Sequence, residues 1–428
     1  MSTPAFSTRN LPGSDDILRA VLSNGPTLLA RENPASPAVI FRGYIPGGSI
    51  LMEPDQAGLA AFYAGMLMAG TKRLAFKDLH DKIESLGASL SIAAGSLTTS
   101  FSGQCLREDL PTLLNLLREI FTEPAFPEKQ FKRIKAQTLT ILDLQSQDTG
   151  YMASQAFDTL LYGNHPFALP EMGFSQTVEA FSIPDLQALH QRMLGPKGMV
   201  IAVVGGIAPE AALSELEKTF GDWQNPDQAE MPSIDDVPMP AQTLREHLPL
   251  EEKAQTDLMI GTLAPETMGP DYHASTLGDN ILGRFGMAGR LGEVVREQAG
   301  LAYGIYSSIG TGLGPSAWRV IAGVNPDNLE KAIDLILAEL RRFVNEPVSA
   351  SELEDSRAQI IGRLPLSVES NSGVAQTLLS IQRYGLSLDY LRELPGLLQA
   401  ISPEDILHSA QRYWHPDALV ITSSGRAI

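Results

Sequence analysis

The spacing of apolar positions predicts strands and helices that come in separate groups. Runs rich in Val, Ile, Leu, Phe and Thr predict strands over residues 27–31, 38–45, 89–93 and 97–104. Apolar positions repeated at helical spacing predict helices over residues 109–122 and 128–144. Because the strands and helices do not alternate regularly, we expect an α+β fold in which long antiparallel strands pack on helices.

The chain also contains an internal duplication. Residues 180–205 align with residues 400–425 at a constant offset of 220 residues (400 − 180), with matching Ser, Asp, Gln-Arg, Pro and Val-Ile positions. Residues 116–124, LLREIFTEP, match residues 339–347, ELRRFVNEP, at an offset of 223 residues (347 − 124). Repeats of this size are typical of tandem domains, since solenoid units have periods of about 20–50 residues.

A segment rich in Pro, Asp and Gln separates the two copies. Residues 223–245 show no apolar period, and this composition predicts an interdomain linker. We therefore expect an N-terminal domain over residues 1–222 and a C-terminal domain over residues 246–428.

The stretch over residues 283–308, GRFGMAGRLGEVVREQAGLAYGIYSS, has the richest pattern in the chain. It begins with three glycines at three-residue intervals, Gly283, Gly286 and Gly289. Apolar positions then predict a short helix, and Gly300 is a helix stop signal before a predicted strand with two tyrosines.

Arg296 and Tyr303 lie on the two sides of this predicted turn. Arg296 leaves the end of the helix, and Tyr303 begins the strand. A guanidinium and a phenol hydroxyl that converge can both donate to one carbonyl oxygen, or to the oxyanion that it becomes. The alternative is structural: Arg296 pairs with Glu293 or Glu297 on a solvated face, and Tyr303 belongs to the core.

Composition narrows the range of partners. The 428 residues carry a formal net charge of −18, which argues against nucleic acid and anionic lipid as partners. Hydrophobic residues make up 43% of the chain, an ordinary globular value. The single cysteine, Cys105, excludes an intramolecular disulfide and fits a reducing compartment. Since the N-terminus shows no apolar signal region, we expect a cytoplasmic protein, or a periplasmic one if a signal peptide was removed.

The sequence R-x-x-x-G-L-A-Y over residues 296–303, after a glycine-rich loop, resembles the Arg/Tyr element of the pitrilysin/insulinase-type zinc metallopeptidases. This family includes mitochondrial processing peptidase. The resemblance implies two similar α+β domains, each with a mainly antiparallel sheet, that form one half of a clamshell. It also implies that the Arg/Tyr element faces a zinc site.

Residues 45–90 resemble the zinc-site region of the same family, without its ligands. An active member carries H-x-x-E-H on a helix, where histidines at i and i+4 share one face and bind zinc. In register, the histidine positions hold Ala61 and Gly65, and the glutamate position holds Ala64. The third ligand position, a glutamate in active members, matches Ile141. None of these side chains can bind zinc, and no two of the seven histidines lie at i and i+4. We therefore expect no metal bound by this chain.

The resemblance then implies a non-catalytic, substrate-binding subunit, a pseudoenzyme, of a heterodimeric zinc metallopeptidase that cleaves unfolded peptides. A homologous partner would carry H-x-x-E-H and the zinc. Arg296 and Tyr303 would act at the partner's zinc site, and Gly283, Gly286 and Gly289 would shape a loop for peptide entry. Two alternatives stay open: an inert structural protein derived from the same family, and a homodimeric peptide-binding protein.

Overall fold

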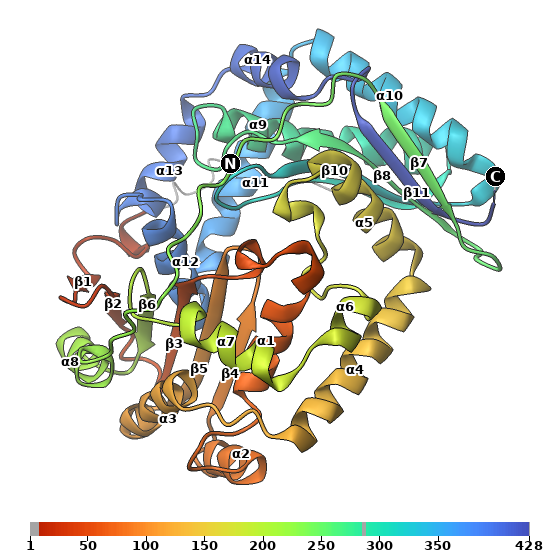
Figure 1. Cartoon of the computed structure of the whole chain (residues 1–428). Coiled ribbons are helices and arrows are strands. Elements are labelled where there is room, and N and C mark those ends of the chain that lie inside the picture. The colour runs from red at the N-terminus through yellow and green to blue at the C-terminus, as the bar shows by residue number, and fades with distance from the viewer. Residues whose placement is uncertain (1–7, 285–287, 428) are drawn as a thin grey trace. The chain divides into compact units, whose positions relative to one another are not determined.

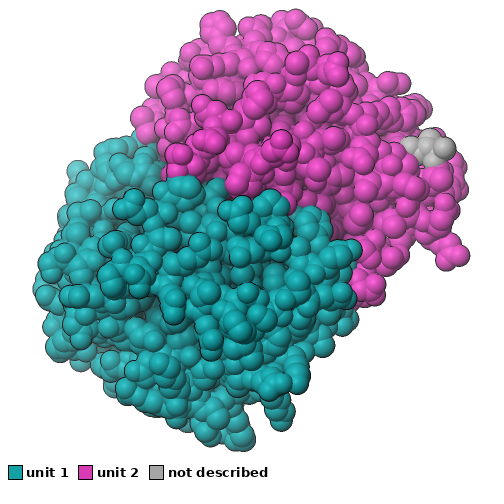
Figure 2. Space-filling view, viewed as in Figure 1, with its two compact units in different colours: residues 1–142, 170–232, 363–393 teal, residues 143–169, 233–362, 394–428 magenta. Residues whose placement is uncertain are grey.

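The computed structural model describes residues 8–284 and 288–427. The chain forms two compact units, each built from three segments of sequence (Figures 1 and 2). Unit 1 comprises Met1–Leu142, Pro170–Pro232 and Arg363–Glu393. Unit 2 comprises Asp143–Leu169, Ser233–Gly362 and Leu394–Ile428. In the described part of the chain, no helix is both long and apolar enough to span a membrane.

Unit 1 is organised around a six-stranded sheet of order β1-β2-β6-β3-β5-β4. Only the pair β2 and β6 is parallel, and the other neighbours are antiparallel. The strands are β1 (Leu18–Val21), β2 (Thr27–Glu32), β3 (Ala38–Pro46), β4 (Ser89–Ala94), β5 (Thr98–Leu106) and β6 (Val200–Gly205).

Helices cover both faces of this sheet. The helices that begin in unit 1 and precede its last segment are α1 (Leu59–Leu67), α2 (Phe76–Ser85), α3 (Leu110–Thr122), α4 (Glu128–Ser146), α6 (Ser175–Ala180), α7 (Ile183–Met193) and α8 (Pro209–Phe220). The larger core lies between helices such as α1 and α3 and one face of the sheet, and it includes Phe41, Tyr63 and Phe121. Helix α12 (Asn371–Arg383), from the C-terminal part of the sequence, packs on β6 and β3 at the other face.

Unit 2 contains a five-stranded sheet of order β7-β11-β8-β10-β9. Here β7 and β11 are parallel, and all other neighbours are antiparallel. The strands are β7 (Leu244–Pro249), β8 (Thr256–Leu263), β9 (Ala302–Ile309), β10 (Ala317–Val324) and β11 (Val420–Gly425). Both units therefore confirm the predicted α+β class, with mixed and mainly antiparallel sheets.

The helices of unit 2 also lie on two faces. They are α5 (Thr149–Tyr162), α9 (Tyr272–Asp279), α10 (Leu329–Asn345), α11 (Ala350–Ser367), α13 (Tyr390–Gln399), which begins in unit 1, and α14 (Pro403–Tyr413). Trp318 and Trp414 stack in the larger core, with ring centroids 4.8 Å apart. Helix α5 packs against β11 and β8 on the other face and encloses a smaller core around Phe157.

The predicted duplication is confirmed in secondary structure. Helices α7 and α14 begin and end at positions 220 apart, and so do strands β6 and β11. Both helices begin with a Ser-x-x-Asp capping box, Ser182 with Asp185 and Ser402 with Asp405. In each sheet the last strand of the repeat has one parallel neighbour, β2 for β6 and β7 for β11.

The two compact units do not correspond to a single division of the chain at residues 223–245. Residues 143–169, which contain α5, belong to unit 2, and residues 363–393, which contain α12, belong to unit 1. Helix α5 is tied to unit 2 by hydrogen bonds that include Thr422 Oγ1 to the Ala153 carbonyl, 2.8 Å. Residues 224–243 have no regular secondary structure, as expected of the predicted linker. The domain limits proposed from the sequence stay a prediction.

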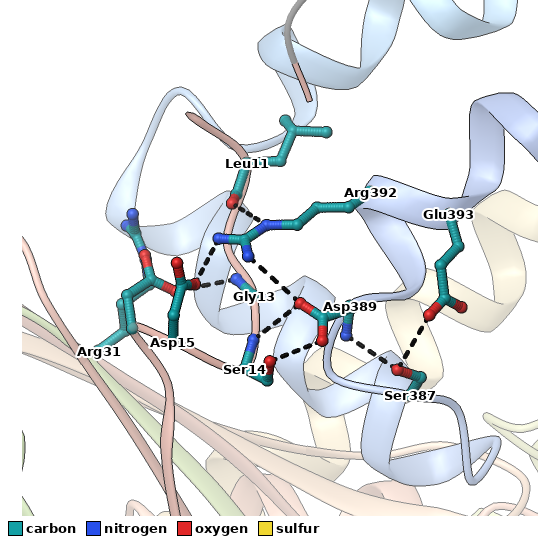
Figure 3. A network of polar contacts seen from close by, with 10 residues as sticks. Leu11, Gly13, Ser14, Asp15, Arg31, Ser387, Asp389, Arg392 and Glu393 are labelled. Carbon is teal, nitrogen blue, oxygen red and sulfur yellow. Dashed lines mark hydrogen bonds and ion pairs between the residues drawn. The ribbon is translucent and has the colours of Figure 1, made fainter. Parts of the chain in front are cut away.

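A polar network fixes the N-terminal segment of unit 1 (Figure 3). The Arg392 guanidinium donates to the Leu11 carbonyl at 2.9 Å and to an Asp15 oxygen at 2.5 Å. Ser14 donates to Asp389 through its amide, at 3.0 Å, and its hydroxyl, at 2.6 Å. Because Arg392 also pairs with Asp389, one arginine joins the segment before β1 to the turn that leads into α13.

Candidate functional site

The corner between residues 292 and 303 of unit 2 has the predicted helix-turn-strand form. Its helical part, Gly292–Gln298, is a π-helix, a rare form that occurs frequently at functional sites. Gly300 adopts φ +65°, a left-handed conformation that favours glycine, and its amide donates to the Arg296 carbonyl at 3.0 Å. The turn thus ends the helix at once and leads directly into β9.

Tyr303 is turned outward by a β-bulge. Strand β9 places Ile305, Ser307 and Ile309 in the interior, so strict alternation would place residue 303 inside as well. The pairing with β10 changes register here, because Val324 lies opposite Ala302 while Gly323 lies opposite Gly304. Tyr303 is therefore the extra residue of the bulge, with no residue opposite it on β10. Its side chain is 90% exposed, contrary to the core alternative. Bulges often re-aim a side chain next to an active site.

Arg296 projects from the other side of the same turn. Its side chain is 40% exposed, and its contact with Glu297 joins Nε and Oε1 at 4.0 Å, the outer limit of an ion pair. Glu293 accepts a hydrogen bond from Gln298 instead, at 3.0 Å. An exposed pair of this length contributes little to stability, so it does not explain why an arginine stands here.

Two of the three predicted loop glycines are buried and packed together. A Cβ atom on Gly283 would lie 2.6 Å from Ser307 Oγ and 2.8 Å from the Ser307 amide nitrogen. A Cβ atom on Gly289 would lie 3.0 Å from the Cα of Gly283. These glycines let the two ends of the loop meet against β9. Gly286 lies outside the described residues, and a substrate-binding role for all three stays a prediction.

Asp279, which the sequence analysis did not single out, lies beside β9, where its backbone carbonyl accepts from Ser307 Oγ at 3.3 Å. It ends α9, its exposed fraction is 0%, and Trp318 Nε1 donates to its Oδ1 at 2.8 Å. Burial raises the pKa of the Asp279 carboxyl to about 6, and hydrogen bonds from Ser307 and Trp318 oppose the rise. The only signal in the sequence is a single charged residue within an otherwise uncharged helical stretch, STLGDNILG.

The predicted zinc positions lie on α1 and α4 of unit 1 and offer no ligand atoms. Ala61 is half-buried, Ala64 is buried, and Gly65 is exposed with no atom within 4 Å of the position of an added Cβ. Ile141 is 43% exposed and lines an open depression of about 580 Å³ with Ala136, Gln137 and Thr140. Among residues 8–284 and 288–427, no three His, Cys, Asp or Glu side chains gather as metal ligands would. These residues do not fit a zinc ion.

Two family models match most of the chain. Residues 27–166 match "Insulinase (Peptidase family M16)", and residues 180–360 match "Peptidase M16 inactive domain". The chain belongs to the M16 (insulinase) peptidase family. The family resemblance that the sequence indicated is thereby confirmed.

Curated relatives are similar over most of their length. The "Uncharacterized zinc protease YmxG" of Bacillus subtilis is 23% identical over 83% of this chain and 85% of its own. The "Non-peptidase homolog YmxG" of Helicobacter pylori is 23% identical over 89% of this chain and 87% of its own.

Solved structures share the fold of the whole chain. An M16 inactive domain from Pseudomonas fluorescens superposes with a TM-score of 0.90 at 24% identity, covering 96% of this chain and 98% of that one. A Helicobacter pylori protein described as a protease superposes with a TM-score of 0.86 at 18% identity, covering 96% and 99%. Together with the family matches, the replaced ligand positions make this chain an inactive M16 member.

Proposed function

We propose that this chain is the non-catalytic subunit of a heterodimeric zinc metallopeptidase that cleaves unfolded peptides. Its partner is a homologous chain that carries H-x-x-E-H and binds the zinc ion. Arg296 and Tyr303 of this chain bind a backbone carbonyl of the peptide. Their hydrogen bonds strengthen as that carbonyl becomes a tetrahedral oxyanion in the partner's site.

The exposure of Tyr303 is the observation that carries this proposal. A tyrosine at a strand position normally buries its ring, because an aromatic ring gains free energy by leaving water. Here a bulge turns the ring outward to 90% exposure, at the same turn from which Arg296 projects. A purely structural role does not account for the cost of exposing this ring to water. A site in which Tyr303 and Arg296 both donate hydrogen bonds to a ligand accounts for it.

The local charge also suits a peptide carbonyl. Arg296 is a planar donor that is only loosely held by Glu297, and Tyr303 offers a hydroxyl with no partner imposed by packing. Both groups can therefore turn toward one acceptor without first breaking a strong internal bond. The acidic chain as a whole, at net −18, favours peptides that carry Lys and Arg.

Reconstitution of the heterodimer from its two chains tests this proposal. This chain is purified alone, and again after co-expression with an H-x-x-E-H chain of similar length from the same genome. We expect no peptidase activity and no stoichiometric zinc in the chain alone, and both in the complex. Zinc bound stoichiometrically by this chain alone would contradict the proposal. A stable homodimer or membrane complex, inactive with every H-x-x-E-H chain tested, would favour the inert protein instead.

A further inference from the structure

The glycine-rich loop is held at both ends by one face of α11. Before the loop, Asn280 Nδ2 donates to Ser356 Oγ at 3.0 Å, and both side chains are buried. After the loop, Arg290 donates to Glu352 through Nε at 2.7 Å and through Nη2 at 3.0 Å. Glu352 and Ser356 are four residues apart on one helix, so they lie on the same face.

Arg290 is the stronger of these two anchors. Its side chain is only 10% exposed, and its guanidinium lies over the Phe343 ring of α10 at 5.1 Å. The two parallel N–H···O bonds to Glu352 fix the plane of the guanidinium as well as its position. Glu339, 4% exposed, adds a second carboxylate at 3.6 Å from Nη1.

Glu352 is itself held in place. Its Oε2 accepts from both the amide and the hydroxyl of Ser349, each at 2.8 Å, at the beginning of α11. The hydrogen bonds from Arg290 and Ser349 lower the pKa of the Glu352 carboxyl to about 2, so it stays ionised. The acceptor of the Arg290 fork is therefore a rigid, permanently charged group.

The helix that carries Arg296 needs such an anchor. It begins at Arg290. Leu291 and Val295 are fully buried on one side, and Val294 and Ala299 pack half-buried against the same core. Apolar contacts are non-directional, so they fix how deep the helix lies but define its rotation and sliding less sharply than a pair of hydrogen bonds does. The π-helical form from Gly292 onward leaves further freedom, because its hydrogen-bonding geometry departs from that of a regular helix. The two parallel hydrogen bonds from Arg290 to Glu352 supply a constraint on the direction in which this helix lies.

We propose that Arg290 is a positioning residue that aims Arg296 at the peptide carbonyl. It acts from the beginning of the same helix and touches no substrate. This inference rests on the proposed function, since it concerns the same site. It adds that α11, through Glu352, sets the direction from which Arg296 reaches its ligand.

The test measures kinetics of the reconstituted complex on a fluorogenic, unstructured peptide. Arg290→Lys keeps the charge but removes the two-pronged contact, and Glu352→Gln removes the ionised acceptor in case the first variant folds poorly. We expect either variant to lower kcat about tenfold, as a displaced catalytic group does, with KM nearly unchanged. The control is Arg341→Lys, whose exposed partner Asp417 belongs to the same unit; it should leave kcat unchanged.

A double variant separates positioning from simple loss of stability. Arg290→Lys combined with Arg296→Ala should be no slower than Arg296→Ala alone, because Arg290 acts only through Arg296. Rate losses that multiply, or wild-type kcat in Arg290→Lys and Glu352→Gln, would overturn the positioning role while the proposed function stands. Wild-type kcat in Arg296→Ala itself would overturn both.

Discussion

Trp318 Nε1 donates a hydrogen bond of 2.8 Å to Oδ1 of Asp279, a carboxylate with no exposed surface. The contact joins β10 to the end of α9, directly before the segment that leads into the glycine-rich loop. Oδ2 of Asp279 has no hydrogen-bond partner among the described residues. A buried carboxylate with one unsatisfied oxygen is costly when it is ionised.

This cost predicts a pH dependence of stability. The pKa of Asp279 is raised from 3.8 to about 6 on folding, so the folded state binds the proton more tightly than the unfolded state. The contribution of Asp279 to the stability of the fold is therefore most favourable below pH 4, and it is lost as the pH rises through about 6. Asp279→Asn keeps the acceptor for Trp318 and removes the ionisation. As the pH rises from 4 to 8, the free energy of unfolding of the variant should increase relative to that of wild type by on the order of 2–3 kcal/mol.

Urea unfolding of both proteins at several pH values measures this difference. The difference between variant and wild type is the quantity of interest, because other groups titrate equally in both. A difference that does not change with pH would show that Asp279 is not protonated in the folded state near pH 5.

Two glycines of the α1 region, where the sequence analysis placed the zinc positions, should respond oppositely to alanine. Gly65 lies inside α1 with open space around an added Cβ, so Gly65→Ala should stabilise the fold by about 0.5–1 kcal/mol. Gly58, at the N-terminus of the same helix, has φ +93°, and its Cβ would lie 2.4 Å from the Met172 carbonyl oxygen. Gly58→Ala should therefore destabilise the fold. Chemical denaturation midpoints check both, and equal signs would contradict the local geometry.

The duplicated capping boxes should contribute similarly in the two units. At the beginning of α14 the Ser402 hydroxyl donates to Asp405 Oδ2 at 2.8 Å and accepts from the Asp405 amide at 3.2 Å, and at the beginning of α7 the Ser182 hydroxyl donates to Asp185 Oδ2 at 2.6 Å. Replacing either serine by alanine should cost about 1 kcal/mol of stability. Thermal and urea unfolding of the two single variants would measure this, and a negligible cost at either site would show that its cap is dispensable.

Zinc binding should be recoverable on the scaffold. Ala61 and Gly65 are four residues apart on α1, and neither is fully buried, so histidines fit there; the buried Ala64 has no such room. Ala61→His, Gly65→His and Ile141→Glu together should give a chain that binds zinc stoichiometrically. Metal analysis after dialysis tests this. Absence of zinc in a folded triple variant would show that α4 does not present residue 141 to α1 as in active relatives.

Much of the fold could be predicted because its signals are local. The predicted strands over residues 27–31 and 38–45 became β2 and β3 with ends shifted by one residue, since apolar spacing and turn residues determine them. The 220-residue offset holds for α7 with α14 because the same capping chemistry recurs in both copies. The turn at Gly300 followed from the preference of glycine for positive φ.

Features that depend on distant parts of the chain could not be predicted in this way. Nothing local shows that α5 packs on the sheet of unit 2, or α12 on that of unit 1, because an apolar helix face does not specify which sheet it packs on. The bulge at Tyr303 is visible only in its pairing with β10. The fork from Arg290 to Glu352 joins residues 62 positions apart, and no spacing rule connects them.

We propose that Arg296 and Tyr303 act together on the substrate in a partner's active site. The most direct measurement is kcat of the reconstituted complex carrying Arg296→Ala or Tyr303→Phe, with Tyr306→Phe as the matched control on the same exposed strand. Loss of one such donor typically costs roughly 2.7–4 kcal/mol, so each of the first two variants should lower kcat at least about tenfold. The control should keep wild-type kcat. Wild-type rates in both Arg296→Ala and Tyr303→Phe would contradict the account.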